Sequence, residues 1–361
     1  MDAAKPPLTK PTVIDYQPDH HEAVFRLYAE VFGQEGSANF RARWRWSQVE
    51  NQAPEETQRW VLVTNDRVVG FLATVPLPYR VGGRDVLVKY SCDFMVHPEF
   101  RFYGLALMRA YMKTCSHCVS LDDIGATIAI LKMMGATPIG NSQGYARPLD
   151  TSALIRRDPR LRHLPGFALS GGDLALRTYD RARALACLSR IEEVPDFDAR
   201  FDRFFWRCEA VTPVTLRRGS AFLNWRYGPN SPHAGRRIGV VLDSRGEIEG
   251  YIVACASTAA QRWGHVFELH GLPELPRRHY AALLLFACRV LRNEGCSVLR
   301  LFHFETRTTA PVQALKEVHF MRRQHQHTLL AKFGEASLNA LALDSKNWSY
   351  SFGDAEASYS L

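Results

Sequence analysis

The hydrophobic positions in the first hundred residues follow two different periods, which predict an ordered series of strands and helices. In residues 13–32 a short apolar run is followed by apolar positions spaced three and four apart, which is typical of a strand leading into an amphipathic helix. Two β-rich runs, 60–63 and 68–75, flank the Asn-Asp pair at 65–66, a hairpin signal. A further run covers 86–96. The pattern therefore predicts an antiparallel meander.

Residues 93–113 predict a strand that passes through a tight basic turn into an amphipathic helix. Arg101, Gly104 and Ala106 form the pattern R-x-x-G-x-A at this turn. Small residues let a backbone approach a ligand closely, and the start of a helix beside an arginine favours an anion. A pyrophosphate would suit such a turn. The alternative is a helix start that packs closely against a sheet, with Arg101 as a solvated cation.

Strand, R-x-x-G-x-A turn and helix, in this order after a meander, resemble the acyl-CoA-binding motif of the GNAT N-acyltransferase superfamily. The resemblance implies that acetyl-CoA or another acyl-CoA is the cosubstrate and that backbone amides of the loop hold its pyrophosphate. It also implies that the backbone of the fourth strand pairs with pantetheine and polarises the thioester carbonyl. The residues that would bind the cosubstrate are Met95, Val96, Arg101, Phe102, Tyr103, Gly104, Leu105 and Ala106.

The chain also contains an internal repeat. Gly70 lies 26 positions after Trp44, and Gly250 lies 25 positions after Trp225, where each tryptophan opens a Trp-Arg-aromatic segment. Similar landmarks at similar spacing predict two copies of one unit. At the position of the loop, residues 272–282 of the second copy contain arginines but no glycine, and two prolines remove amides that a phosphate needs. We therefore expect only the first copy to bind the donor.

Two such units predict an α/β (α+β) fold class with two GNAT-like domains, each a mixed, mostly antiparallel twisted sheet flanked by helices. The expected boundaries are an N-terminal domain with the acyl-CoA loop at 1–148, a linker at 149–172, a degenerate C-terminal domain at 173–335 and a tail at 336–361. Aromatic residues in the tail favour docking on the body of the protein. The two Trp-Arg segments are expected to form a structural helix or the wall of a cleft.

Acyl transfer to an amine also requires a group that removes a proton from the ammonium. Asp93, on the predicted fourth strand, is the candidate base, because related enzymes often carry an acidic or water-holding residue there. The alternative is an ordinary hydrogen-bonded aspartate. Asp122 and Asp123, after the predicted fifth strand, are the other acidic candidates.

The acid that protonates the leaving thiolate is harder to assign. Many members of the family place a tyrosine four residues before a Gly-Phe step in the last helix. Here that position holds Leu131, and Gly135 is followed by alanine. Tyr145 is therefore the candidate catalytic tyrosine, with Tyr103 or water as alternatives.

Composition narrows the functional classes. The net charge of +8, from 45 Lys and Arg against 37 Asp and Glu, is spread along the chain. Such a charge suits a polyanionic cosubstrate, whereas nucleic-acid binding would favour clustered basic runs. No apolar run is long enough to span a bilayer, and the N-terminus lacks the apolar core of a signal peptide, so we expect a cytoplasmic protein.

No metal site is expected from the sequence. Eight cysteines scattered over the chain look like small buried hydrophobic residues. The pair Cys115 and Cys118 lacks a second pair at ligand spacing, and it follows a helix rather than beginning one. His325 and His327 alternate in a β-like run, a pattern more typical of an exposed strand face than of metal ligands.

The preferred interpretation is an acyl-CoA-dependent N-acyltransferase that transfers an acyl group, acetyl first of all, to a primary amine of a small molecule or amino sugar. The N-terminal domain would bind the donor, and the cleft between domains would bind the acceptor. One alternative is a Fem-like aminoacyl transferase that uses aminoacyl-tRNA. The other is a non-catalytic coenzyme A-binding or assembly protein, which the leucine at position 131 favours. Sequence leaves the acceptor, the acyl chain length, the choice between acyl-CoA and acyl carrier protein, and the oligomeric state open.

Overall fold

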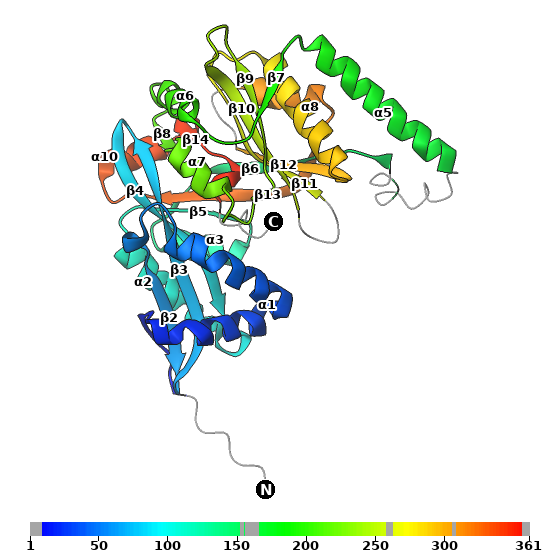
Figure 1. Ribbon diagram of the computed structural model, residues 1–361. Coiled ribbons are helices and arrows are strands. Elements are labelled where there is room, and N and C mark those ends of the chain that lie inside the picture. The colour runs from blue at the N-terminus through cyan, green and yellow to red at the C-terminus, as the bar shows by residue number, and fades with distance from the viewer. Residues whose placement is uncertain (1–8, 152–154, 156–165, 258–262, 305–307, 356–361) are drawn as a thin grey trace.

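The computed structural model describes residues 9–151, 155, 166–257, 263–304 and 308–355. Its main feature is one mixed sheet with helices on both faces (Figure 1). Along the sheet the strands follow the order β1-β2-β3-β4-β5-β13-β6-β12-β11-β10-β9-β7. Most neighbouring strands are antiparallel, and the pairs β4–β5 and β11–β12 are parallel. The predicted α/β class with a mixed, mostly antiparallel sheet is confirmed.

The first half of the chain supplies one end of this sheet. Its elements are β1 (Thr12–Asp15), α1 (His21–Trp44), β2 (Arg59–Thr64), β3 (Arg67–Val81), β4 (Arg84–Val96), α2 (Gly104–Thr114), β5 (Cys118–Asp122), α3 (Gly125–Met133) and β6 (Thr137–Pro148). Asn65 and Asp66, with φ of 46° and 57°, join β2 to β3. Positive φ at both turn residues is the geometry of the two-residue hairpin, as the Asn-Asp pair predicts.

The second half repeats much of this order. Its elements are α5 (Gly166–Ala186), β7 (Ile191–Val194), α6 (Ala199–Glu209), β8 (Val214–Leu216), α7 (Ser220–Tyr227), β9 (Arg237–Leu242), β10 (Ile248–Ala256), β11 (Trp263–Gly271), α8 (Arg277–Asn293), β12 (Val298–Phe304), α9 (Ala310–Glu317), β13 (Met321–Lys332), α10 (Ala336–Ala342) and β14 (Trp348–Ser349). No helix in the described part of the chain combines the length and apolar character needed to cross a bilayer.

The two halves exchange their last long strands. β13, from the second half, pairs with β5 of the first half, and β6, from the first half, pairs with β12 of the second. β6 and β13 also pair with each other, so the sheet runs without a break through the molecule. The part of the sheet formed by residues 1–148 is therefore completed by β13, and the part formed by residues 173–335 is completed by β6. A division of the chain into consecutive domains does not describe this exchange.

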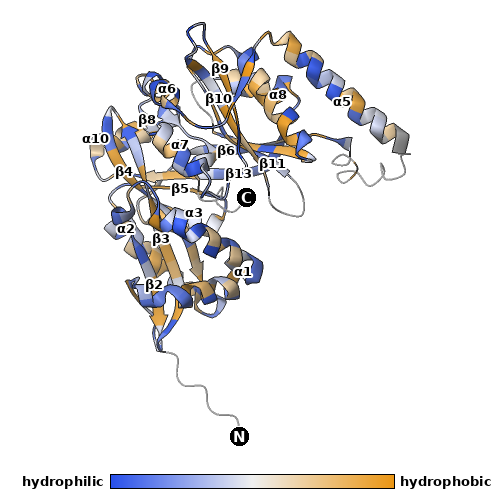
Figure 2. Cartoon of the chain, in the orientation of Figure 1, coloured by the Kyte–Doolittle hydropathy of each residue, from blue (hydrophilic) through white to orange (hydrophobic). Residues whose placement is uncertain are grey.

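Hydrophobic residues are concentrated in the strands of the sheet and in parts of the helices that cover it (Figure 2). One continuous cluster packs against α1, α6 and α7, and thus spans both halves. On the opposite face, one cluster lies under α2 and α3 and another under α8 and α9. Consecutive residues such as Val61 and Leu62 belong to opposite clusters, as the pleat of a strand requires.

The Trp-Arg segments meet where the halves join. The rings of Trp46 and Trp225 stack with centroids 5.0 Å apart. Trp46 Nε1 donates to the carbonyl of Trp225 at 2.8 Å, and Trp225 Nε1 donates to the carbonyl of Trp46 at 3.2 Å. These segments have the structural role that was expected, although the tryptophan paired with Trp225 is Trp46 and not Trp44.

The predicted linker lies mostly outside the described residues, and its end, including Gly171 and Gly172, belongs to α5. In the tail, the aromatic side chains of Trp348, Tyr350 and Phe352 are buried in the cluster that spans both halves. The described part of the tail is therefore docked on the body, as its aromatic content indicates. Residues 356–361 lie outside the described part.

Candidate functional site

β4 carries a bulge near its end and then diverges from β5. Met95 lies opposite Phe71 and Cys92 opposite Ala73, so one extra residue is inserted in β4 between them. At this bulge Asp93 has a φ of 55°, a left-handed value. β4 pairs with β5 only through Lys89 and Tyr90. Beyond these two pairs the strands separate, which leaves the backbone of the last residues of β4 unpaired on the β5 side.

The loop after β4 forms a 3₁₀ helix, Pro98–Tyr103, and α2 begins directly after it at Gly104. A Cβ atom at Gly104 would lie 3.0 Å from Cζ of Phe94 and 3.2 Å from Cγ2 of Val96. Close packing of α2 on β4 therefore favours glycine here, whether or not a ligand binds. The N–H of Gly104 donates to the carbonyl of Arg101, so this amide already has a partner within the loop.

Large apolar side chains are exposed on the loop and at both ends of α3. Phe102 is 80% exposed, and the guanidinium of Arg101 lies 5.1 Å from its ring centroid. Ile124 and Met133, at the start and end of α3, are 60% and 74% exposed. Large exposed apolar side chains that gather near a basic loop are typical of a ligand surface. The eight cosubstrate-binding positions lie together on β4, this loop and the first turn of α2, and their ligand role stays a prediction.

Asp93 is engaged in a buried ion pair. Its Oδ1 lies 2.5 Å from Nη2 of Arg43, in α1, and the two side chains are 0% and 4% exposed. This contact fits the alternative to a catalytic base, namely that Asp93 is an ordinary hydrogen-bonded aspartate. A role as a base would require Arg43 to yield this contact to an incoming ammonium, so the catalytic role of Asp93 stays a prediction.

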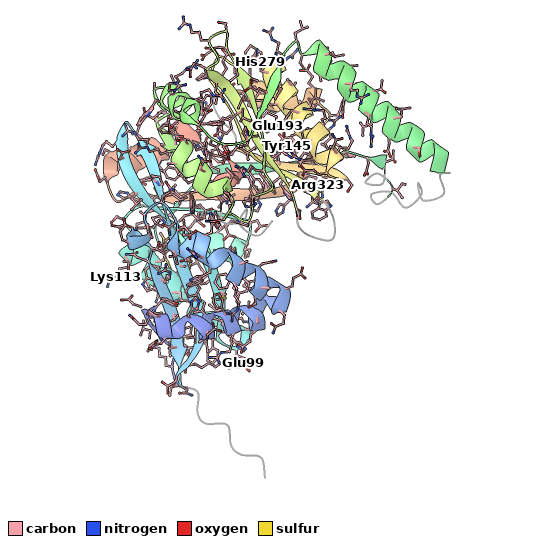
Figure 3. The ribbon with its side chains drawn as sticks, in the orientation of Figure 1. Glu99, Lys113, Tyr145, Glu193, His279 and Arg323 are labelled. Carbon is pink, nitrogen blue, oxygen red and sulfur yellow. The ribbon has the colours of Figure 1, made fainter. Side chains whose placement is uncertain are left out.

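Tyr145 lies far from Asp93. Its position on β6 is directly opposite Leu301 of β12, and its ring packs with the cluster under α8 and α9. β5 and β13 separate β6 from β4, a distance of about 14 Å between strand axes. Figure 3 likewise shows Tyr145 in the half opposite to Glu99 of the loop. The structure does not bring the two predicted catalytic residues together.

Asp122 and Asp123, the alternative candidates for the catalytic base, lie at the end of β5. Burial raises the pKa of Asp122, whose Oδ1 accepts a hydrogen bond from the N–H of Ile124 at 2.7 Å. Asp123 follows it, and its Oδ2 lies 3.3 Å from Nε2 of His325. Tyr103 is half-buried beside the first turn of α2. Asp123 therefore contacts the other half of the chain through a side-chain ion pair, as Tyr145 does through its packing with the cluster under α8 and α9.

A pocket between the halves adds residues that sequence reasoning missed. It has a volume of about 450 Å³ and is lined by side chains from the central strands and the tail, among them His265, Arg300, Phe302, His325, His327 and Phe352. His327 packs edge-on against Phe302, with centroids 4.6 Å apart. Burial lowers the pKa of His327. Burial therefore favours the neutral form of this histidine.

Asp123, His325 and His327 could also hold a metal ion together. One ligand atom from each residue lies within 4.8 Å of the others, in a two-histidine, one-carboxylate set. The ion pair between Asp123 and His325 explains part of this proximity without a metal. In the sequence, only the alternating pair His325 and His327 indicates this site. Asp123 approaches them because β13 pairs with β5, and the sequence pattern does not predict that pairing.

Comparison with known proteins connects the geometry to a family. Residues 12–122 match a family model described as an acetyltransferase (GNAT) domain, and this range includes the loop and the start of α2. No curated protein matches the chain by sequence.

Solved structures with the same fold cover nearly the whole chain. N-myristoyltransferase from Saccharomyces cerevisiae with bound myristoyl-CoA has a TM-score of 0.59 at 13% identity, over 92% of this chain and 85% of that one. A GCN5-related N-acetyltransferase from Anabaena variabilis has a TM-score of 0.60 at 14% identity, over 92% and 75%. A probable N-acyltransferase from Enterococcus faecalis has a TM-score of 0.56 at 12% identity, over 92% and 74%. At these identities the likeness establishes the fold.

Proposed function

We propose that the protein is an acyl-CoA-dependent N-acyltransferase that acylates a primary amine of a small molecule, because residues 12–122 match the model of the GNAT acetyltransferase domain. The observation that carries this proposal is the divergence of β4 from β5 directly before the loop and α2. The unpaired edge of β4 supplies backbone groups for the pantetheine arm, and Arg101 supplies a positive charge beside the diphosphate. Acetyl-CoA is the first donor to test.

In this proposal, donor and acceptor approach from opposite faces of the sheet. α2 and its loop lie on the face of one apolar cluster, and the pocket with Phe302 and His327 lies on the face of α1. The gap between β4 and β5 connects the two faces. β13, which carries His327, is two strands from β4, or at least about 10 Å between strand axes because β4 and β5 have diverged here. A thioester that reaches through the gap would therefore lie beside the pocket.

The chemistry assigned to the pocket is proton transfer and acceptor binding. The amine attacks the thioester carbon, the C–S bond breaks, and coenzyme A leaves as the thiolate. Neutral His327 takes the proton that the amine must lose. Arg300 and Arg323, which also line the pocket, favour an acceptor that carries an acidic group beside its amine.

One observation favours the non-catalytic alternative, a coenzyme A-binding or assembly protein. Leu131 is 1% exposed in the apolar cluster under α2 and α3, so the position where the family carries a tyrosine points into the core. Asp93 is also occupied by Arg43. If these features mean that the chemistry has been lost, the chain would bind the donor without turnover.

Thiol release from acetyl-CoA, measured over a panel of amines with and without an acidic group, separates the two functions. An enzyme should release coenzyme A with at least one amine. The variant His327→Gln should then lower kcat by about 10²-fold and leave acetyl-CoA binding unchanged, because general base catalysis contributes about 10² or more. Arg109→Gln, an exposed charge on α2, is the control. Absence of turnover with every amine, despite acetyl-CoA binding, would favour the non-catalytic function.

A further inference from the structure

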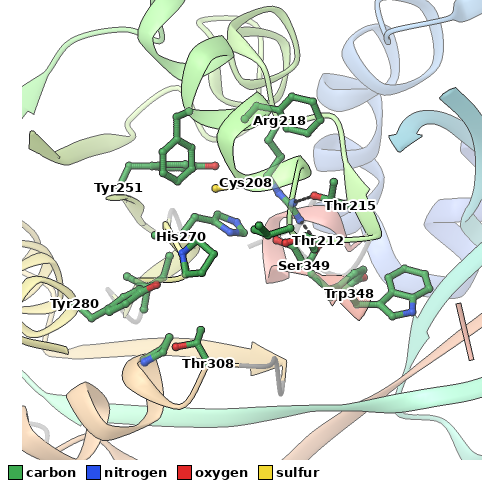
Figure 4. A pocket seen from close by; sticks show the side chains of 18 of the residues that line it. Cys208, Thr212, Thr215, Arg218, Tyr251, His270, Tyr280, Thr308, Trp348 and Ser349 are labelled. Carbon is green, nitrogen blue, oxygen red and sulfur yellow. Dashed lines mark hydrogen bonds between the residues drawn. The ribbon is translucent and has the colours of Figure 1, made fainter. Parts of the chain in front are cut away.

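A second cavity lies wholly in the C-terminal half, where no donor was expected. It has a volume of about 270 Å³ and lies between β11 and β12, with α6, α8 and the tail around it (Figure 4). β11 pairs with β12 from Trp263 to Val266, and beyond Val266 the strands separate. The cavity therefore occupies the same place relative to its two strands as the gap between β4 and β5 does in the N-terminal half.

Local sequence and backbone support this equivalence. Asp93 stands four residues before His97-Pro-Glu, and Glu268 stands four residues before Leu272-Pro-Glu. β11 carries a bulge beside Glu268, since Val253 pairs with Glu268 and the next residue, Ala254, pairs with Val266. In both halves an acidic residue thus lies at a bulge just before the strands diverge. The second copy has kept this feature while losing the glycine loop.

Glu268 is the centre of a buried polar network. It accepts hydrogen bonds from the hydroxyls of Tyr227 and Ser351, each at 2.6 Å, and its Oε2 lies 2.7 Å from Nε2 of His270. Burial opposes ionisation of Glu268, but the hydrogen bond with His270 and the charge of Arg218 outweigh it and lower its pKa to about 2. A permanently ionised Glu268 accepts the proton on Nε2, which leaves Nδ1 of neutral His270 as a hydrogen-bond acceptor.

A second histidine lines the same cavity. Burial lowers the pKa of His303 to about 4, with the neighbouring His270 acting in the same direction. Its Nε2 is buried and makes no hydrogen bond to any residue that the structure describes. An unsatisfied buried polar group costs about 1–3 kcal/mol. A ligand with a polar group at this point would remove that cost.

The walls limit the size and charge of such a ligand. Rings of Tyr251, Tyr280 and Trp348 line the cavity, and its volume equals that of about nine liquid water molecules. Arg218, the buried cation, already binds Thr215, the carbonyl of Ser349 and the carboxylate of Asp354. Lys346, the other cation in the lining, is exposed to solvent. The buried part of the site therefore offers little to an anion, and without a glycine loop it offers little to a diphosphate.

We propose that this cavity is a separate binding site for a small uncharged molecule that has a ring or short aliphatic body and one hydroxyl or N–H group. The ligand donates a hydrogen bond to Nδ1 of His270, its polar atom also meets Nε2 of His303, and its body packs against the aromatic walls. This site is distinct from the proposed acyltransferase site, and its occupation does not require acyl transfer. The C-terminal half is thus a binding unit in its own right.

Calorimetric titration with phenol, toluene and benzoate tests this site on the full chain. Phenol should bind at least tenfold more tightly than toluene, which lacks the donor, and tenfold more tightly than benzoate, which brings a charge next to Glu268. His270→Phe should reduce phenol affinity to that of toluene while toluene affinity changes less than threefold. Equal affinities for phenol and toluene in the wild type, or no binding of either, would overturn the proposal.

A variant that fills the cavity tests whether the ligand binds there, and its melting temperature shows whether it is folded. Thr212→Trp places an indole at the rim formed by α6 and β8, and should abolish binding of both phenol and toluene. The melting temperature reports whether each variant is folded. If Thr212→Trp unfolds the chain, displacement of toluene by phenol in the wild type remains as the test, because two molecules that bind one cavity must compete. Phenol binding that persists in a folded Thr212→Trp variant would place the site elsewhere.

Discussion

Gly104→Glu is expected to reduce acetyl-CoA affinity by at least a hundredfold. Gly104 begins α2, where the helix dipole favours negative charge on a ligand. A carboxylate at this position would repel the diphosphate, and its side chain, which starts against Phe94 and Val96, would crowd the contact between α2 and β4. Calorimetry with acetyl-CoA measures the change directly.

Gly104→Gln is the matched control, because glutamine has the same shape without the charge. Any side chain here must displace the ring of Phe94, 3.0 Å from the new Cβ, and this ring is 37% exposed and can move. We therefore expect both variants to fold with similar melting temperatures, and glutamine to bind the donor more tightly than glutamate. Wild-type affinity in Gly104→Glu would contradict the assignment of the donor to this loop.

Asp93→Ala is expected to lower the free energy of unfolding by about 3–5 kcal/mol, which is the usual effect of removing one partner of a buried ion pair. Arg43 would remain in the apolar interface between α1 and the sheet without the carboxylate at 2.5 Å. Urea denaturation of the two proteins measures the difference. The bulge adds to the effect, because Asp93 has a left-handed φ of 55° that alanine adopts less readily than aspartate.

Asp85→Ala is the control for this experiment. Asp85 belongs to the same strand and lies 3.2 Å from Arg80, but its side chain is 68% exposed, and removing it should cost about 0.5 kcal/mol or less. If Asp93→Ala unfolds at the same urea concentration as Asp85→Ala, the ion pair is not a stabilising part of the core. Asp93 would then be free to serve primarily in catalysis.

Features that depend on neighbouring residues were predictable from the sequence. The Asn65-Asp66 turn, the strand ending at Val96 and the helix after the R-x-x-G-x-A turn were all predicted close to their observed positions. Each is determined by local backbone preferences and by the period of apolar residues. The mixed sheet followed from their order together with the internal repeat.

Features that depend on pairing between distant segments were not predictable in this way. Nothing local to β13 indicates that it pairs with β5, some two hundred residues earlier, because the paired segments 328–332 and 118–122 are short runs without a distinguishing feature. The contact of His325 with Asp123 depends on that pairing. The burial of Asp93 against Arg43 likewise depends on how α1 crosses the sheet. For the same reason, Tyr145 could not be placed on β6 opposite β12.

The central claim is that the loop before α2 holds the diphosphate of the donor and that the corresponding loop of the second half does not. A crystal structure of the protein with bound coenzyme A tests it most directly. The account predicts diphosphate oxygens within hydrogen-bond distance of backbone amides in residues 102–106, with the pantetheine arm between β4 and β5. A diphosphate bound instead at residues 272–282, before α8, would contradict it.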